Sequence, residues 1–313
     1  MPFKRNPQKF SAAVTPVTIG TGERAVTLGG ENVMPLYTFD APIENRPRIG
    51  VEIAEPGFEK AMPGLADYYA GAETIADLAK KAAAMPGADF IAINLECADP
   101  NGEDRSVDEC VEMCKAAADA VDMPIAVIGC KNHDKDAKLF EKISDALQGK
   151  NILVMSACEE NYKTVAASAG LAYGQKVGAE SSVDINLAKQ LNVLISQMGL
   201  STDNVVMNVG SAAAGYGFEY VASTMDRVRG AALSQNDAML QSPIITPVAD
   251  DAWNVKEAMI SEEDMPEWGP TERRGVTMEI ATAAACLASG SNAVILRHPE
   301  SVAAVSKFIG ELM

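Results

Sequence analysis

The chain has 313 residues, of which 48% are hydrophobic, and it carries a formal net charge of −17 at pH 7. Such an acidic chain is a poor partner for nucleic acid or for anionic membranes, because both are negatively charged. No apolar run approaches the roughly 20 residues of a membrane span, and the first residues lack the apolar core of a signal peptide. We therefore expect a cytoplasmic protein that folds as one domain.

The first predicted element is an antiparallel β-hairpin. Residues 14–19 and 25–28 are apolar, and they flank a Gly20-Thr21-Gly22-Glu23 turn. Two short apolar runs on either side of such a turn are typical of a hairpin. We treat residues 1–46 as a hairpin and lead-in to the main part of the chain. The hairpin is expected to cover part of the core, and the bottom of a barrel is one place where it would fit.

Eight short apolar runs then alternate with helical segments. The runs are rich in Val and Ile and mostly continuous, which is typical of parallel strands buried on both faces. A βα unit repeated eight times predicts an α/β fold, a (β/α)₈ or TIM barrel over residues 47–313. The predicted strands are residues 47–53, 89–95, 124–130, 151–155, 175–179, 204–209, 243–248 and 292–296.

Several helical segments carry clear signals at their ends. Ser106 and Glu109 have the spacing of a capping box. Gly199 is placed to end a helix whose apolar stripe runs from Ile185 to Met198, and Pro299 suits the first turn of the last helix. These signals support the alternation of strands and helices.

Two of the loops that follow predicted strands are long, namely residues 55–71 and 249–270. Long loops in a compact domain are often functional. The second loop carries Trp253 and Trp268. The sequence leaves open whether these rings are exposed contact anchors or pack over the helix layer.

The six cysteines lack the spacing of a metal site, since no C-x₂-C pair occurs. Those in helical segments are predicted to be buried thiols, whereas three others follow strands and would lie near the barrel mouth. The first group is Cys110, Cys114 and Cys286, and the second is Cys97, Cys130 and Cys158. We therefore expect no metal ligands in this chain.

The two histidines give no catalytic pattern either. His133 lies in a charged loop and is expected to be exposed, and His298 precedes Pro299, where it can cap a helix. No nucleophile elbow, zinc-protease motif or phosphate-binding loop occurs. We predict no catalytic residues.

Short polar or glycine-rich patterns follow several of the predicted strands. Each one alone is a helix cap or a turn. Together, and in this order, they make the chain resemble the small, delta-type subunit of the corrinoid/iron–sulfur protein of the acetyl-CoA synthase/CO dehydrogenase pathway. The resemblance covers nearly the whole chain, from Thr27-Leu28-Gly29-Gly30 through Asn45-Arg46-Pro47 and Ala98-Asp99-Pro100 to Arg297-His298-Pro299-Glu300. Its most specific parts are Asp184-Ile185-Asn186 and Gly215-Tyr216-Gly217.

The resemblance implies a TIM barrel that pairs with a larger subunit. The large subunit of this family carries a [4Fe–4S] cluster and a corrinoid-binding domain, and the corrinoid (cobalamin) lies between that domain and the top of the barrel. The heterodimer carries a methyl group on cobalt from a methyltetrahydrofolate methyltransferase to acetyl-CoA synthase/CO dehydrogenase. Because the chemistry belongs mainly to the cofactor, the barrel need only cover and orient it.

The loops at the carboxyl ends of the strands are where a barrel binds its ligand, so we expect them to face the corrin. The glycines permit close backbone approach, and a tyrosine ring offers a flat face. The predicted cofactor-facing residues are Asn94, Ser182, Asp184, Asn186, Gly215, Tyr216, Gly217 and Thr246.

Two alternatives stay open. The barrel could be a stand-alone pterin-dependent methyltransferase in which Asn94, Asp184 and Asn208 hydrogen-bond the pterin ring. It could also be a purely structural scaffold subunit that does not contact the cofactor. The sequence does not separate folate from an archaeal pterin as the methyl donor.

Overall fold

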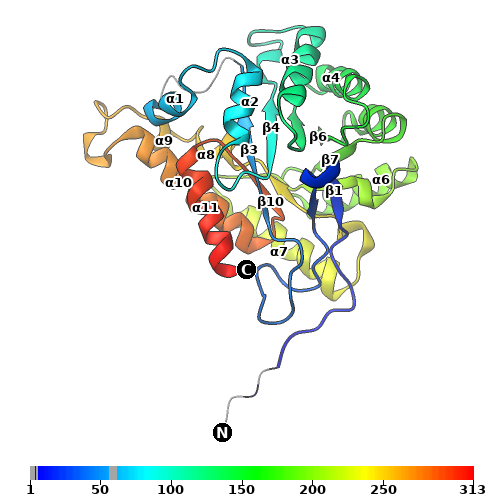
Figure 1. Ribbon diagram of the computed structural model, residues 1–313. Coiled ribbons are helices and arrows are strands. Elements are labelled where there is room, and N and C mark those ends of the chain that lie inside the picture. The colour runs from blue at the N-terminus through cyan, green and yellow to red at the C-terminus, as the bar shows by residue number, and fades with distance from the viewer. Residues whose placement is uncertain (1–3, 5, 56–61) are drawn as a thin grey trace.

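The computed structural model describes residues 4, 6–55 and 62–313 (Figure 1). Within them, eight parallel strands form one sheet in the order β8-β7-β6-β5-β4-β3-β10-β9. A parallel bridge between Met207 and Ile244 joins the two ends of that order, which closes the sheet and confirms the predicted barrel. The strands are β3 (Arg48–Ile53), β4 (Phe90–Asn94), β5 (Ile125–Ile128), β6 (Leu153–Ala157), β7 (Lys176–Glu180), β8 (Val205–Asn208), β9 (Ile245–Thr246) and β10 (Ala293–Leu296).

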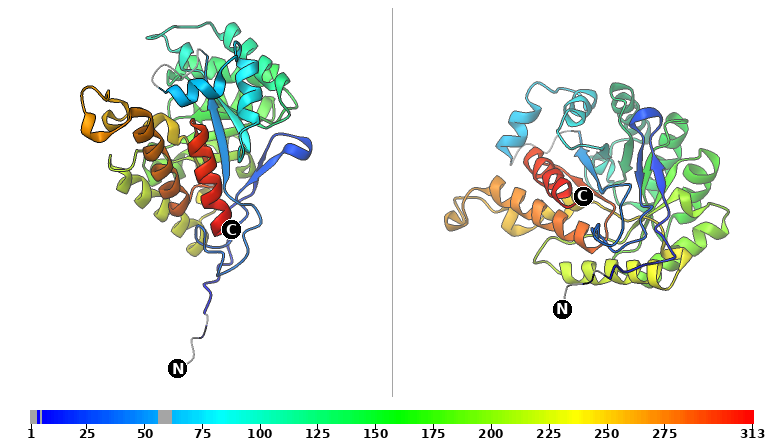
Figure 2. Two further views of the ribbon diagram at one scale, coloured as in Figure 1. Left: turned by 60° about the vertical axis from the view of Figure 1, so that its left-hand side comes forward. Right: turned by 60° about the horizontal axis from the view of Figure 1, so that its bottom comes forward.

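Helices surround the sheet (Figure 2). The predicted capping box of Ser106 and Glu109 is present, and Pro299 occupies the first turn of α11. Gly199 follows the end of α6 with φ +102°, as its position predicted. The helices are α1 (Pro63–Tyr69), α2 (Ile75–Ala83), α3 (Val107–Ala120), α4 (His133–Ala146), α5 (Tyr162–Val165) with a π-helical turn (Ala166–Ala172), α6 (Ile185–Gln197), α7 (Phe218–Ser234), α8 (Val248–Ala252), α9 (Lys256–Met259), α10 (Thr271–Ser289) and α11 (Pro299–Leu312).

The predicted hairpin is confirmed, and it closes the amino-terminal end of the barrel (Figure 2, right). Its strands β1 (Val17–Ile19) and β2 (Val26–Leu28) pair antiparallel. Their apolar side chains belong to the same buried cluster as the side chains that fill the barrel lumen. Asn151, which precedes β6, donates to the carbonyl oxygens of Thr18 and Gly20 at 2.9 and 3.0 Å. The hairpin therefore completes the core from below.

The two tryptophans of the loop before α10 have different environments. Trp253 is only 1% exposed, and it packs so closely on α10 that a Cβ at Gly275 would lie 2.0 Å from its ring. Trp268 is exposed, with the Arg274 guanidinium 5.9 Å from the ring centre. Trp253 therefore packs against the helix layer, and Trp268 is exposed, so its role as a contact anchor stays a prediction.

The first long loop of the prediction is described only in part, since residues 56–61 lie outside the described residues.

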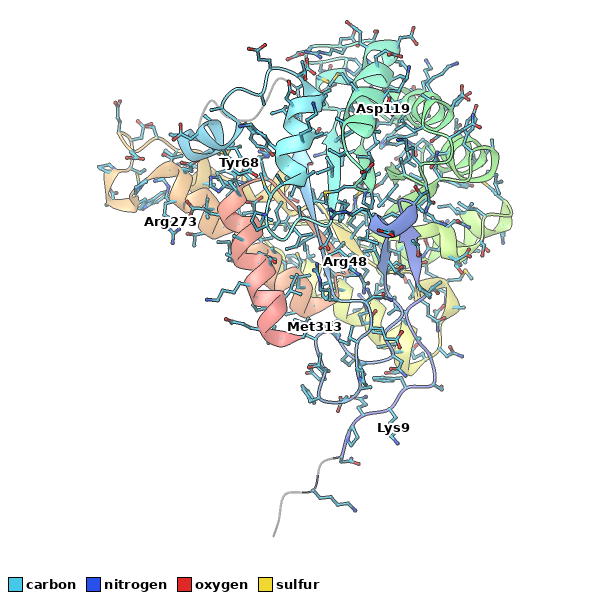
Figure 3. The ribbon with its side chains drawn as sticks, in the orientation of Figure 1. Lys9, Arg48, Tyr68, Asp119, Arg273 and Met313 are labelled. Atoms are coloured by element: carbon cyan, nitrogen blue, oxygen red, sulfur yellow. The ribbon has the colours of Figure 1, made fainter. Side chains whose placement is uncertain are left out.

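Charged side chains such as Asp119 and Arg273 lie on the outer helices (Figure 3). Across the described part of the chain, no helix has the length and apolar character that crossing a membrane requires.

Candidate functional site

A cavity of about 350 Å³ opens at the carboxyl-terminal mouth of the barrel. Its floor is apolar, because Ile128 and Met155 belong to the lumen cluster. Its wall is polar and largely acidic, and it comes from the ends of β5 to β9 and from the loops that follow them. The charged or hydrogen-bonding side chains of this wall are Lys131, His133, Asp136, Ser156, Glu180, Ser182, Asn208, Ser211, Asp250 and Asp251.

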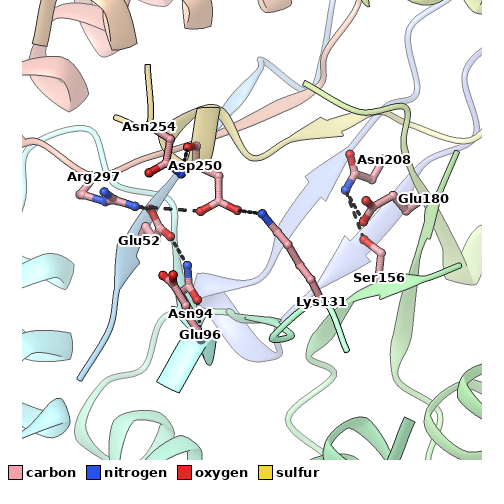
Figure 4. A network of polar contacts seen from close by, with 10 residues as sticks. All are labelled: Glu52, Asn94, Glu96, Lys131, Ser156, Glu180, Asn208, Asp250, Asn254 and Arg297. Carbon is pink, nitrogen blue, oxygen red and sulfur yellow. Dashed lines mark hydrogen bonds and ion pairs between the residues drawn. The ribbon is translucent and has the colours of Figure 1, made fainter. Parts of the chain in front are cut away.

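One side of the cavity is a hydrogen-bonded group on β6, β7 and β8 (Figure 4). The Asn208 amide donates to the Glu180 carboxylate at 3.1 Å and to the Ser156 hydroxyl at 3.3 Å. Its oxygen accepts the Gly210 amide at 3.1 Å, so the orientation of Asn208 is fixed. Burial raises the pKa of Glu180, although a hydrogen bond with Ser156 and the charge of Lys131 oppose the shift. The group therefore presents fixed donors and acceptors beside an apolar floor.

The opposite side is built on a buried ion pair between β3 and the end of β10. Glu52 is 2% exposed, and its carboxylate lies 3.1 Å from the Arg297 guanidinium. The Asn94 amide donates to the other oxygen of Glu52 at 2.6 Å, and its own oxygen accepts the Glu96 amide at 2.8 Å. Burial raises the pKa of Glu52 against the opposing charge of Arg297. Burying this ion pair costs desolvation free energy, and the pair is stable only because close polar contacts offset that cost.

Two carboxylates on α10 hold the segment that carries Arg297. Glu279, which is fully buried, accepts the backbone amides of Arg297 and His298 at 2.6 and 3.3 Å. The His298 ring accepts the Glu300 amide at 3.2 Å, so the predicted helix cap is confirmed. Its other nitrogen lies 3.1 Å from Glu272. These hydrogen bonds fix the backbone from which the Arg297 side chain extends into the mouth.

Lys131 crosses the mouth between these two sides (Figure 4). Its ammonium lies 3.0 Å from Asp250, whose other oxygen is 4.0 Å from Arg297. A second cavity of about 140 Å³ lies beyond this bridge and includes Asn94 in its wall. Gly129, Lys131 and Asp250 line both cavities. The Lys131–Asp250 pair is therefore a wall between two compartments of one mouth.

The loop after β5 has a local reason for its shape. The Asp136 carboxylate accepts the Cys130 amide at 2.7 Å and comes so close that a Cβ at Gly129 would lie 2.5 Å from it. Lys131 itself has φ +66°, which is rare for a residue with a side chain. Glycine at 129 and the carboxylate at 136 thus fix the loop from which Lys131 extends.

The comparisons with known proteins identify the family. Residues 16–302 match the family described as the CO dehydrogenase/acetyl-CoA synthase delta subunit. The chain belongs to this family. It is 33% identical over 300 residues to the acetyl-CoA decarbonylase/synthase complex subunit delta of Archaeoglobus fulgidus, covering 94% of this chain and 65% of that protein. The Methanothermobacter thermautotrophicus subunit delta is 32% identical over 302 residues, covering 94% of this chain and 75% of that protein.

The chain thus spans about two thirds of the length of several delta-subunit relatives that it matches. Solved structures of dihydropteroate synthases share its fold. Those from Vibrio fischeri and Yersinia pestis have TM-scores of 0.56 and 0.55 at 14% and 12% identity. They cover 89% and 95% of this chain, and 98% of each of those chains is matched. This likeness concerns the barrel fold alone.

The predicted cofactor-facing residues of this family member do not form one cluster. Asn94 lines the smaller cavity and Ser182 the larger one. Asp184 caps α6 by accepting the amides of Asn186 and Leu187 at 2.7 and 3.3 Å. The Asn186 side chain is exposed at that helix start.

Three of the remaining predicted residues precede α7, and one lies elsewhere. Gly215 and Gly217 have φ of +89° and +84°, and the Tyr216 between them is 44% exposed. Thr246 is fully buried, and its hydroxyl bonds that of Ser291, next to β10. The structure therefore does not bring Thr246 to either mouth cavity.

Sequence reasoning did not predict the charged residues that organise the mouth, namely Glu52, Lys131, Glu180 and Asp250. It noted Arg297 only as part of the Arg297-His298-Pro299-Glu300 pattern, without a role at the mouth. The signal for Glu52 and Glu180 was a carboxylate in or at the end of an otherwise apolar strand. Buried charges of this kind are usually paired, so each one pointed to a polar partner, and in the structure that partner lies on or just after a neighbouring strand.

The cysteines of the helices are buried, as predicted. Cys97 lies beside Cys110, and hydrogen bonding between the two thiols lowers the pKa of Cys97. Cys130 and Cys158 line different mouth cavities. Among the residues that the structure describes, no three His, Cys, Asp or Glu side chains are arranged to hold a metal ion. Contrary to the prediction, His133 does not lie in a loop but begins α4. Its side chain is 43% exposed at the cavity wall and lies 3.6 Å from Glu160.

Proposed function

We propose that this barrel is the small subunit of a corrinoid/iron–sulfur methyl carrier, and that its mouth covers a corrinoid held by a larger subunit. The large subunit would hold the [4Fe–4S] cluster. The carrier would take a methyl group from a methyltetrahydrofolate methyltransferase and deliver it to acetyl-CoA synthase/CO dehydrogenase. The observation that carries the proposal is a polar mouth with exposed aromatic rings beside it, on a member of the delta-subunit family.

The residues that precede α7 fit a large flat cofactor. Tyr216 and Tyr220 are 44% and 67% exposed, and rings of this kind form flat apolar contacts. A Cβ at Gly215 would meet no atom within 4 Å, so a ligand has room to approach the backbone there. Asn186 and Ser182 offer hydrogen bonds from the neighbouring loop. When bound, the corrinoid supplies the nucleophilic cobalt, and these residues orient it and exclude water.

Substitutions at the mouth test this assignment. Tyr216→Ala or Asn186→Leu should speed corrinoid loss from the assembled heterodimer or slow methyl transfer, while thermal unfolding of the barrel barely changes. Tyr37→Ala is a matched control, because Tyr37 is also 44% exposed but lies in the lead-in segment. Corrinoid spectra and transfer rates that match the control for both variants would contradict the proposal.

The proposal also requires a substantial interface with the large subunit. A stable interface of this kind buries well over roughly 1,000 Å². Mixed subunits should therefore elute as one complex in gel filtration at micromolar concentration. Separate elution of the two subunits would count against a carrier built from both.

A second candidate is a pterin-dependent methyltransferase, and the cavity itself favours it. Its volume of about 350 Å³ is within the range of small-molecule sites, and Glu180 and Asn208 offer a carboxylate and an amide beside an apolar floor. Such an enzyme would turn over methyltetrahydrofolate without a partner, and Glu180→Gln would slow it. A scaffold subunit would instead leave the corrinoid spectrum of the complex unchanged.

A further inference from the structure

The charge around the mouth is unbalanced. The larger cavity has four carboxylates in its wall, those of Asp136, Glu180, Asp250 and Asp251, against the single ammonium of Lys131. Burial raises the pKa of Glu180 and of Asp251, which reflects the cost of keeping these charges in the wall. An anionic ligand group would add to that cost, whereas an N–H donor would reduce it.

Lys131 and Asp250 differ in how firmly they are held. The Lys131 side chain is 77% exposed, whereas that of Asp250 is 17% exposed. Asp250 also faces Arg297, which Glu52 and the α10 carboxylates keep in place. An exposed ion pair is easily broken, because solvent screens it. Lys131 is therefore the movable member of the pair and Asp250 the fixed one.

The position of Lys131 gives its movement a consequence. The ammonium and Asp250 separate the cavities of about 350 and 140 Å³. Although the side chain is largely exposed, desolvation beside the mouth acts to lower the pKa of Lys131; Asp250, Asp251 and Glu180 outweigh this effect and raise the pKa, so the ammonium stays charged. If Lys131 swings into solvent, the compartments join and the Asp250 carboxylate is left without that partner.

We infer that a nitrogen-bearing group of the ligand displaces the Lys131 ammonium and binds the Asp250 carboxylate in its place. The ligand then occupies both compartments. The ligand class is neutral or cationic with N–H donors, and carboxylates are excluded. Under the proposed function, on which this identification rests, the group is a carboxamide arm of the corrinoid. Lys131 and Asp250 are then specificity-determining residues.

The isolated chain gives a test that needs no corrinoid. Cys158 lines the larger cavity, and iodoacetamide and iodoacetate differ only in carrying an amide or a carboxylate. Mass spectrometry should show that Cys158 prefers iodoacetamide more strongly than free cysteine does. Lys131→Met should raise that preference roughly twofold to fivefold, since it removes the ammonium from the wall. Lys138→Met, an exposed lysine on α4, is the matched control.

The assembled complex gives the second test, with cobalamin and a cobalamin monocarboxylate as probes. Lys131→Met should slow cobalamin loss roughly twofold to fivefold, because the internal competitor is gone. Asp250→Asn should reduce the discrimination against the monocarboxylate. If Lys131→Met matches Lys138→Met in both tests, the inference is overturned. If Lys131→Met changes the alkylation preference but neither Lys131→Met nor Asp250→Asn changes cobalamin retention, the charge preference of the cavity stands and the corrinoid is not its ligand.

Discussion

Arg297→Met tests whether the buried pair with Glu52 anchors the mouth. Methionine keeps most of the side-chain volume but leaves the Glu52 carboxylate, 2% exposed, without its cation. Breaking a buried pair in this way costs about 3–5 kcal/mol. The unfolding entropy of a chain of this length is about 0.66 kcal/mol/K, so the midpoint of thermal unfolding should fall by about 5–8 °C.

A second substitution separates lost charge from lost packing. Glu52→Gln combined with Arg297→Met removes both charges, and a glutamine oxygen can still accept from Asn94, so much of the lost stability should return. Arg273→Met is the matched control, because Arg273 and its partner Glu300 are 69% and 64% exposed. Circular dichroism measures all three midpoints. A fall for Arg297→Met no larger than for Arg273→Met would refute the reasoning.

Three further predictions concern stability and metal content. Gly275→Ala should destabilise the protein by about 1–3 kcal/mol in thermal or urea unfolding, because the new methyl group would overlap the Trp253 ring. Burial raises the pKa of Glu180 above 4.5, so the folded state binds the Glu180 proton more tightly than the unfolded state does. The free energy of unfolding should therefore fall as pH rises from 4.5 through the folded pKa. Urea titrations at several pH values should show that Glu180→Gln flattens this decline. Elemental analysis of the isolated chain should find no stoichiometric iron, zinc or cobalt, and about one metal per chain would contradict the reading of its cysteines.

The barrel was predictable because its strands are continuous apolar runs separated by helices with clear end signals. The mouth was less predictable, because its organising contacts join distant parts of the chain. Glu52 and Arg297 are 245 positions apart, and no local pattern connects them. A carboxylate inside an apolar strand indicated that a partner existed but not which residue it was.

Thr246 shows a second limit. Successive side chains of a strand point to opposite faces, so a shift of one residue decides whether a side chain faces the barrel lumen or the helix layer. β9 has only two residues, Ile245 and Thr246. Ile245 joins the lumen cluster, and Thr246 turns toward Ser291. So short a run contains no alternation from which the facing of Thr246 could be read.

The hairpin under the barrel has a consequence for the order of folding. Gly20 accepts a hydrogen bond from Asn151, 131 positions later in the chain, and strands β6 to β10 follow Asn151. The hairpin precedes every barrel strand in the chain, so it has no lumen to fill until much of the sheet exists. Closing so long a loop is slow compared with forming the local βα units. The bottom layer of the barrel core is thus supplied by residues that precede the barrel in sequence, and we expect it to pack after the strands above it have formed.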